Sequence, residues 1–209
     1  MGLAARSIFQ KKQTGLSSQQ KQVVKSIARR QVARKNEVKF TDLHVSTSVG
    51  TVALSSHNIV NITQGDAYNE RIGMQISPLE VTLRGTITVN ATAVRNVVRL
   101  IIFRWQIDNA VSVPSTAGLF EDSANSVWLS PYKHDIRQFI PLYDKLYVVD
   151  SVGNPIQEFV IDIKQNLKTM CGYTAGANTG TNQLYVGLVS DQNVNTPTVT
   201  FHASVRYTD

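Results

Sequence analysis

Apolar and polar side chains alternate strictly over residues 78–89, PLEVTLRGTITV, and this alternation constrains the fold more than any other feature. The apolar set is Leu79, Val81, Leu83, Ile87 and Val89, and the polar set is Glu80, Thr82, Arg84, Thr86 and Thr88. Successive side chains of a β-strand point to opposite faces. The segment is therefore predicted to be a strand with one face in the core and the other in solvent.

Further strand patterns follow this segment along the chain. VVRLIIFRWQI (97–107) is apolar on both faces, which is typical of a central sandwich strand. DKLYVVD (144–150) and EFVIDI (158–163) flank SVGNPIQ, which predicts a hairpin that turns at Gly153, Asn154 and Pro155. QLYVGLV (183–189) predicts one more strand. The closing segment TVTFHASVRYT predicts a strand with His202 outward and these residues inward: Val199, Phe201, Ala203, Val205 and Tyr207.

Irregular strand spacing favours a double-sheet jelly roll over an up-and-down barrel. The loop at 108–135 is rich in Ser, Pro and Asn and has room for one short helical turn. We expect an all-β fold, a single eight-stranded jelly-roll sandwich with a basic, partly helical N-terminal arm. The arm is assigned to residues 1–36 and the jelly roll to residues 37–209.

Charge is divided unevenly along the chain. Residues 1–40 hold ten Lys and Arg against Glu37 alone, a net +9, whereas the remaining residues hold 11 basic and 14 acidic side chains, a net −3. A mildly acidic body that carries a strongly basic arm indicates a polyanionic partner.

The arm contains SSQQKQVVKSIARRQVARK (17–35), which predicts a helix with Ser17 and Gln20 spaced as a capping box. Its apolar face is thin, so we expect it to order mainly on binding. The residues predicted to neutralise nucleic-acid phosphates are Arg6, Lys11, Lys12, Lys21, Lys25, Arg29, Arg30, Arg34 and Lys35. The chain shows no RRM, zinc-finger or helix-turn-helix pattern, so sequence-specific readout is not expected. A disordered solubilising tail and a nuclear-import signal remain alternatives.

Signals for catalysis or membrane insertion are weak. No run approaches the roughly 18 apolar residues that span a bilayer, and no membrane partner is expected. The four histidines have no metal-ligand spacing, and the lone Cys171 excludes a cysteine zinc cluster. The loop QGDAYNERIG (64–73) lacks the lysine of a P-loop and the spacing of a dinucleotide fingerprint. We therefore expect no enzyme activity.

The basic arm is followed in order by QGDAYNERIG, LEVTLRGTITV, VRLIIFRW, RQFIPLYDK and a closing VRYTD. This series resembles the coat proteins of small icosahedral viruses of the satellite tobacco necrosis virus type, whose fold also builds capsids of small circular single-stranded DNA viruses. The resemblance implies self-assembly of 60 identical subunits into a T=1 shell with the arms on a single-stranded RNA or DNA genome. It implies a place in the virion, after synthesis in the host cytoplasm, with the nucleus as a second compartment before assembly.

The resemblance also implies calcium between subunits. Asp66 of QGD matches an aspartate that meets its symmetry mates on a threefold axis, where converging carboxylates need a cation. The main-chain carbonyls of Ile72 and Gln75, with the carboxylate of Asp209, match a second site. A further glutamate from a neighbour's arm corresponds to Glu37, displaced by one residue when counted back from Phe40.

The loop 64–73 is interpreted as the junction between the arm and the first shell strand, with Arg71 free for an ion pair across a subunit interface. The alternative is a turn capped by Asp66 and an ordinary salt bridge from Arg71. Two other classes of protein stay open for the chain, namely a lectin-like cellular jelly roll and a basic-tailed nucleic-acid chaperone.

Overall fold

The computed structural model describes residues 17–35, 37–134, 138–167 and 169–209. The chain divides into two compact units, Met1–Glu37 and Val38–Asp209. This division falls one residue beyond the predicted boundary at residue 36.

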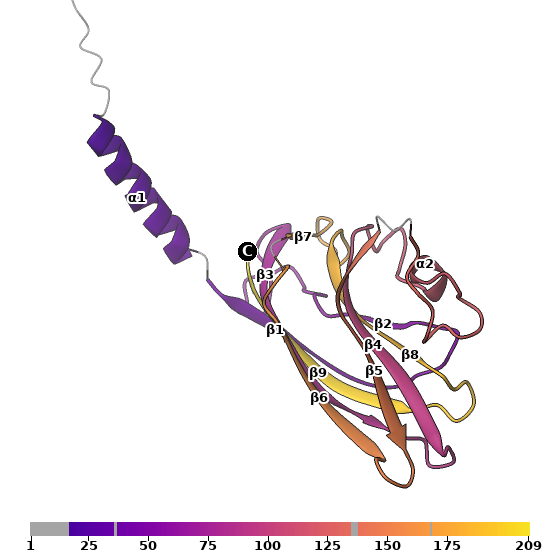
Figure 1. Cartoon of the computed structure of the whole chain (residues 1–209). Helices are drawn as coiled ribbons and strands as arrows, with labels where there is room; N and C mark the ends of the chain where they lie inside the picture. Colours follow the sequence, from indigo (N-terminus) through magenta and orange to yellow (C-terminus); the bar gives the residue numbers. More distant parts are fainter. Residues whose placement is uncertain (1–16, 36, 135–137, 168) are drawn as a thin grey trace, which may run out of the picture. The chain divides into compact units, whose positions relative to one another are not determined.

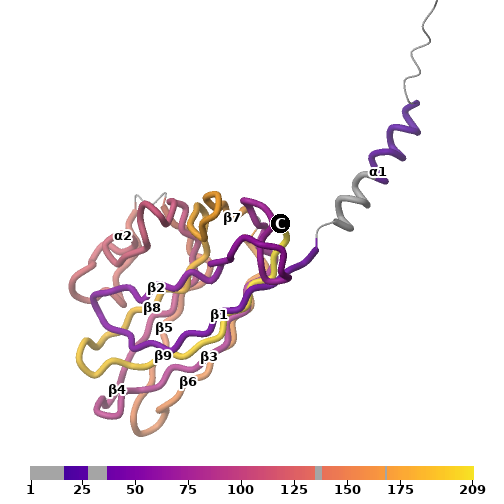
Figure 2. The backbone as a smooth tube through the Cα atoms, turned by 180° about the vertical axis from the view of Figure 1, so that it is seen from behind, coloured from indigo at the N-terminus to yellow at the C-terminus, as the bar shows by residue number. Residues whose placement is uncertain are grey.

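The helix of the first unit, α1, spans Ser18–Lys35, as the sequence predicts (Figure 2). Its capping box forms, because the Ser17 amide donates to Gln20 Oε1 at 2.9 Å and the Gln20 amide donates to Ser17 Oγ at 3.2 Å. No helix in the described part of the chain is long and apolar enough to span a membrane.

The second unit consists of antiparallel strands in two sheets (Figure 1). The first sheet has the order β1 (Lys39–Ser48), β9 (Thr198–Thr208), β3 (Gln75–Thr88), β6 (Ile156–Ile163), and β7 (Cys171–Gly172) pairs with the start of β3. The second has the order β2 (Ser55–Asn58), β8 (Gln183–Ser190), β4 (Arg95–Trp105), β5 (Phe139–Asp150). Eight strands in two sheets with crossing connections confirm the predicted jelly roll, to which β7 adds a short ninth strand.

The inner faces of the two sheets form the main core. On β9 the residues of odd number from Val199 to Tyr207 are buried, which confirms the predicted phase, and His202 is exposed. On β3 the prediction holds for the buried Val81, Leu83 and Ile87 but is wrong for Leu79, which is exposed. The register shifts between Pro78 and Glu80, and such a bulge reverses the facing of the residues before it.

Strand β4 is apolar on both faces because each face has its own cover. Val98, Leu100 and Ile102 pack in the core between the sheets. The other face packs against the segment that contains α2 (Thr116–Leu119), which lies on the outer side of this sheet (Figure 1). The predicted helical turn in the long loop is thus confirmed as part of a second apolar cluster.

The predicted hairpin between residues 144 and 163 is wrong. Strand β5 pairs with β4 and strand β6 pairs with β3, so the two consecutive strands belong to different sheets. Their connection is a tight corner in which Asp150 Oδ1 accepts hydrogen bonds from the amides of residues 152–154. The turn residues correctly predict that the chain reverses here, but they do not determine whether the next strand joins the same sheet or the opposite one.

Candidate functional site

The loop 64–73 lies between β2 and β3, so its interpretation as the junction between arm and first strand is wrong. The loop closes on itself through a bridge between Gln64 and Arg71, in which the Gly65 amide donates to the Arg71 carbonyl at 3.0 Å. Glu70 Oε2 accepts the Ala67 amide at 2.9 Å across the tip. These local bonds fix a compact loop on the jelly-roll body.

Arg71 is buried inside the subunit, with 0% of its surface exposed. Its guanidinium donates to three carbonyl oxygens, those of Ile62 at 3.2 Å, Gly73 at 2.6 Å and Ala177 at 2.6 Å. The same group lies 4.1 Å from the ring centroid of Tyr173. The prediction of a free Arg71 at a subunit interface is therefore wrong, because its donors hold loop segments of its own chain together.

Asp209 binds this loop to the end of β9. Its Oδ2 atom accepts the Ile72 amide at 2.6 Å and lies 3.3 Å from Lys39 Nζ. Lys39 also donates to the Glu70 carbonyl at 2.9 Å, and its side chain and that of Asp209 are 3% and 7% exposed. The structure thus brings Asp209 against the Ile72 amide and the Lys39 ammonium, whereas the Ile72 carbonyl, the predicted calcium ligand, accepts a hydrogen bond from Gln64 Nε2 at 3.3 Å.

Sequence reasoning missed the role of Lys39, which it counted only toward the basic charge of residues 1–40. The alternation of side chains on β1 could have revealed this role, because Lys39 lies on the same face of the strand as the half-buried Leu43 and Val45. A lysine on the inward side of a strand requires a partner, and the partner is the carboxylate at the end of the neighbouring strand.

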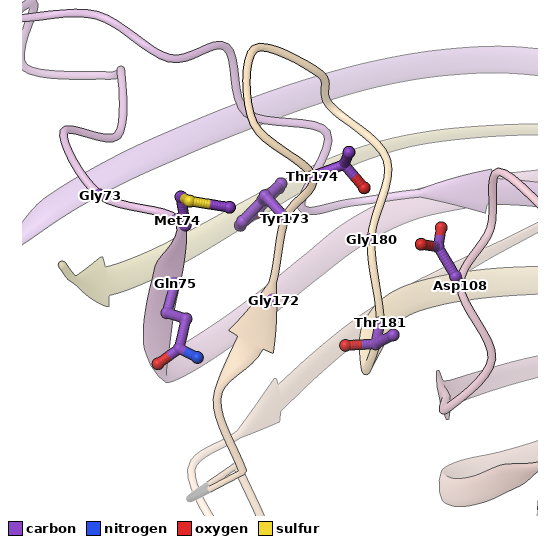
Figure 3. A pocket seen from close by; sticks show the side chains of 9 residues that line it. All are labelled: Gly73, Met74, Gln75, Asp108, Gly172, Tyr173, Thr174, Gly180 and Thr181. Carbon is purple, nitrogen blue, oxygen red and sulfur yellow. The ribbon is translucent and has the colours of Figure 1, made fainter.

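Gln75, the third predicted ligand of the second site, lies at the start of β3 and pairs with Gly172 of β7. Beside it is a pocket of about 580 Å³, lined by Gly73, Met74, Gln75, Asp108, Gly172, Tyr173, Thr174, Gly180 and Thr181. In Figure 3 the Gln75 amide points away from the Asp108 carboxylate, which lies on the opposite side of the pocket. The described lining includes one carboxylate, that of Asp108, and no histidine, cysteine or lysine.

Asp66 lies at the exposed tip of the loop. Its carboxylate has no hydrogen-bond or ion-pair partner within the described ranges. Across those ranges, no group of three or more His, Cys, Asp or Glu is placed to hold a metal ion. A cation at Asp66 would therefore need further ligands, which other copies of the chain could supply.

The residues predicted to bind nucleic acid lie in the first unit. Lys21 and Lys25 are exposed on α1, and Arg29, Arg30, Arg34 and Lys35 fall within the same helix. Arg6, Lys11 and Lys12 fall outside the described residues. Glu37 is exposed at the end of this unit.

A partly buried ion pair between β4 and β5 also holds the long loop, and sequence reasoning missed it. Arg99 of β4 binds both oxygens of Asp144 on β5, at 2.9 and 2.6 Å, and donates to the Ser130 carbonyl at 2.6 Å. The Tyr132 hydroxyl donates to Asp144 Oδ2 at 2.7 Å. Burial alone raises the pKa of Asp144, but the hydrogen bonds from Arg99 and Tyr132 outweigh it and hold that pKa below its ordinary value.

Comparison with known proteins identifies a family for the chain. A family model described as satellite tobacco necrosis virus coat protein matches residues 8–209, from the basic arm to the end of the jelly roll. No curated protein sequence matches the chain. One solved structure with similarity is a chain from Desmodium yellow mottle tymovirus, with a TM-score of 0.42, 9% identity and coverage of 83% of this chain and 88% of that one. The chain therefore belongs to the satellite tobacco necrosis virus coat protein family.

Proposed function

We propose that this protein builds a closed T=1 shell of 60 identical subunits around a single-stranded nucleic-acid genome. Family membership makes the chain a structural protein of the viral capsid. The observation that carries the proposal is the span of the family match, which joins the basic arm and the jelly roll in one coat protein unit. The division of charge supports it, because an acidic body with a basic arm suits a shell that encloses a polyanion.

The arm neutralises the genome without reading its bases. Sixty arms of net +9 would carry about 540 positive charges and release a comparable number of phosphate counterions. This charge suits a genome of several hundred to a few thousand nucleotides. Because lysine and arginine bind the phosphates of RNA and DNA alike, the arm accepts either polymer.

Removal of the arm tests the proposal. Full-length protein, a deletion of residues 1–36 and a variant with the nine arm residues changed to glutamine are purified and compared by negative-stain electron microscopy and by nuclease-protected nucleic acid. We expect uniform closed shells with protected nucleic acid only from the full-length protein. The glutamine variant keeps the arm length and isolates the effect of charge. Normal particles with packaged nucleic acid from either variant would refute the role of the arm.

Electron microscopy of the same samples separates the other classes of protein. A lectin-like module or a nucleic-acid chaperone would give small particles without closed shells. Extraction of particles from infected tissue, followed by ribonuclease or deoxyribonuclease, identifies the genome polymer.

Calcium is proposed as a shell ligand at two positions. Asp66 suits it well, because an exposed carboxylate without a partner in the described part of its own subunit offers hard oxygen ligands to a shared cation. At the second position the carbonyls of Ile72 and Gln75 and the carboxylate of Asp209 would hold the ion, with Glu37 of a neighbouring arm as a further ligand. This position suits calcium less well, since Lys39 already neutralises Asp209.

Chelation tests both positions. We expect EDTA to lower the melting temperature of wild-type particles and to have a smaller effect on particles with Asp66→Asn. Asp42→Asn, an exposed aspartate on β1, is the matched control and should respond to EDTA as the wild type does. An unchanged melting temperature of wild-type particles after chelation would rule out a structural role for calcium.

A further inference from the structure

Arg104 occupies one end of the sandwich core with an incomplete set of hydrogen bonds. It is the penultimate residue of β4 and is 1% exposed. Its Nη1 atom donates to the carbonyl oxygens of Thr169 at 2.8 Å and Asn182 at 3.1 Å. Its Nη2 atom is buried and has no partner within the described residues.

A buried guanidinium nitrogen without an acceptor is destabilising, because it has lost its water and gained nothing in exchange. Arginine stays protonated in proteins, so loss of its proton cannot relieve this penalty. The position therefore suits an acceptor from outside the described part of the subunit.

Arg104 lines a cavity of about 630 Å³ whose other lining residues are Ile140, Lys164, Gln165, Asn166 and Thr169. Among the described residues, the lining has two cationic side chains, two amides and one hydroxyl, and it includes no acidic residue. Lys164 comes from the position that follows β6, and its side chain is 69% exposed. The cavity thus presents hydrogen-bond donors and positive charge to whatever enters it.

Lys164 can turn toward a ligand without leaving a lone carboxylate behind. Its ammonium lies 2.9 Å from Glu80 Oε1, and Arg206 binds the other oxygen of Glu80, also at 2.9 Å. Glu80 would therefore keep one cationic partner.

We propose that this cavity is a binding site for a phosphoryl group, held by Arg104 and Lys164. The Nη2 atom of Arg104 would donate to a phosphate oxygen while Nη1 keeps its two carbonyl partners, and the Lys164 ammonium on its flexible stem adds a point charge. The amides of Gln165 and Asn166 and the Thr169 hydroxyl add donors that a carboxylate with two oxygens would not all use. Free phosphate and the phosphates of a nucleic acid share this chemistry, and the experiment separates them.

The inference goes beyond the proposed function, because the site lies in the jelly-roll body and needs neither the arm nor an assembled shell. If the phosphoryl site does not exist, the proposal of capsid assembly still stands. Packaging by the basic arm, in turn, does not require a phosphoryl site in the jelly roll.

The test compares Lys164→Ala with Arg206→Ala in the full chain. Both variants remove one cationic partner of Glu80, but only Lys164 lines the cavity. Arg104 itself is left unchanged, because its loss would empty a buried position. Inorganic phosphate is titrated into each protein by calorimetry at constant ionic strength, with sodium acetate as the second anion. Hexathymidylate, a short single-stranded DNA, is titrated into the same proteins in a separate series.

We expect saturable phosphate binding to the wild type, a dissociation constant about 10-fold higher for Lys164→Ala, and a change below about 2-fold for Arg206→Ala. If Lys164→Ala also weakens hexathymidylate relative to Arg206→Ala, the phosphoryl group is that of a nucleic acid. If the two variants differ in their affinity for inorganic phosphate but not for hexathymidylate, the ligand of the site is free phosphate. Absence of saturable binding, equal losses in the two variants, or acetate binding as tight as phosphate binding would each overturn the proposal.

Discussion

The ion pair between Arg99 and Asp144 should stabilise the jelly roll through the loop that covers its second sheet. Asp144→Ala removes both acceptors of the Arg99 fork and the acceptor of Tyr132. Loss of one partner from a fully buried pair destabilises a protein by about 3–5 kcal/mol. The Asp144 side chain is 30% exposed, so water partly solvates the charge that remains and we expect a loss of about 2–3 kcal/mol.

Urea unfolding at pH 7 measures this loss, with both tryptophans as reporters. Trp105 belongs to the outer cluster of β4 and Trp128 packs against the same cluster, so their fluorescence follows the covered face. The matched control is Asp42→Ala, whose exposed partner His202 lies 3.9 Å away, and its effect should stay within about 0.5 kcal/mol. Sedimentation confirms that the same assembly state is compared. A loss below about 1 kcal/mol for Asp144→Ala would refute the reasoning.

The contribution of the pair has a defined pH dependence. The pKa of Asp144 is lower in the folded chain than in the unfolded chain, so the stabilisation is complete above the unfolded value of about 3.9. It is lost as pH falls through the lower folded value. The difference between wild type and Asp144→Ala should therefore be constant from about pH 5 to 8 and shrink below about pH 4. A difference that shrinks between pH 6 and 7 would point to a histidine instead.

Three further substitutions test other contacts. Gly85→Ala should destabilise the subunit by about 3 kcal/mol in urea unfolding, because its Cβ would overlap the Thr200 carbonyl. Gly73→Ala should be nearly neutral, because the nearest atom to its Cβ, the Gln75 amide nitrogen, would lie 3.8 Å away. Arg71→Met should lower the free energy of unfolding of unassembled subunits by about 3 kcal/mol, because three carbonyl groups lose their hydrogen-bond donor. Unchanged stability together with failed assembly would contradict the internal role of Arg71. Ser17→Ala should speed amide exchange at Gln20 by about 5-fold, and equal exchange would mean that the capping box contributes nothing.

Local patterns predicted the elements of this fold more reliably than their partners. The phase of β9 and the burial of β4 followed from residue parity and apolar content, both of which are local properties of a strand. Leu79 departed from its predicted side because a single extra residue at a bulge reverses parity, and no local signal marks that residue. The corner between β5 and β6 was read as a hairpin because turn residues favour a reversal without specifying its sheet.

The residues singled out in the loop 64–73 differ in how far sequence reasoning could place them. Asp66 has an exposed carboxylate without a partner in the described part of the chain, and its role as a calcium ligand stays a prediction. Arg71 looked equally free, yet its guanidinium reaches residue 177, more than 100 positions along the chain. A sequence does not show such a partner, because contacts between distant segments depend on how the whole chain packs.

The sequence by itself determined the β character of the body, the helical capping box and the separation of a basic arm. These follow from side-chain periodicity and charge, which act over a few residues or are simple sums. Membership of the coat protein family rests instead on the match of the whole sequence to that family. The tertiary structure alone decided the pairing of Arg99 with Asp144, the burial of Lys39 against Asp209 and the unpartnered nitrogen of Arg104. In each case a buried charge had to find its partner among strands that meet only in the folded sandwich, or was left without one.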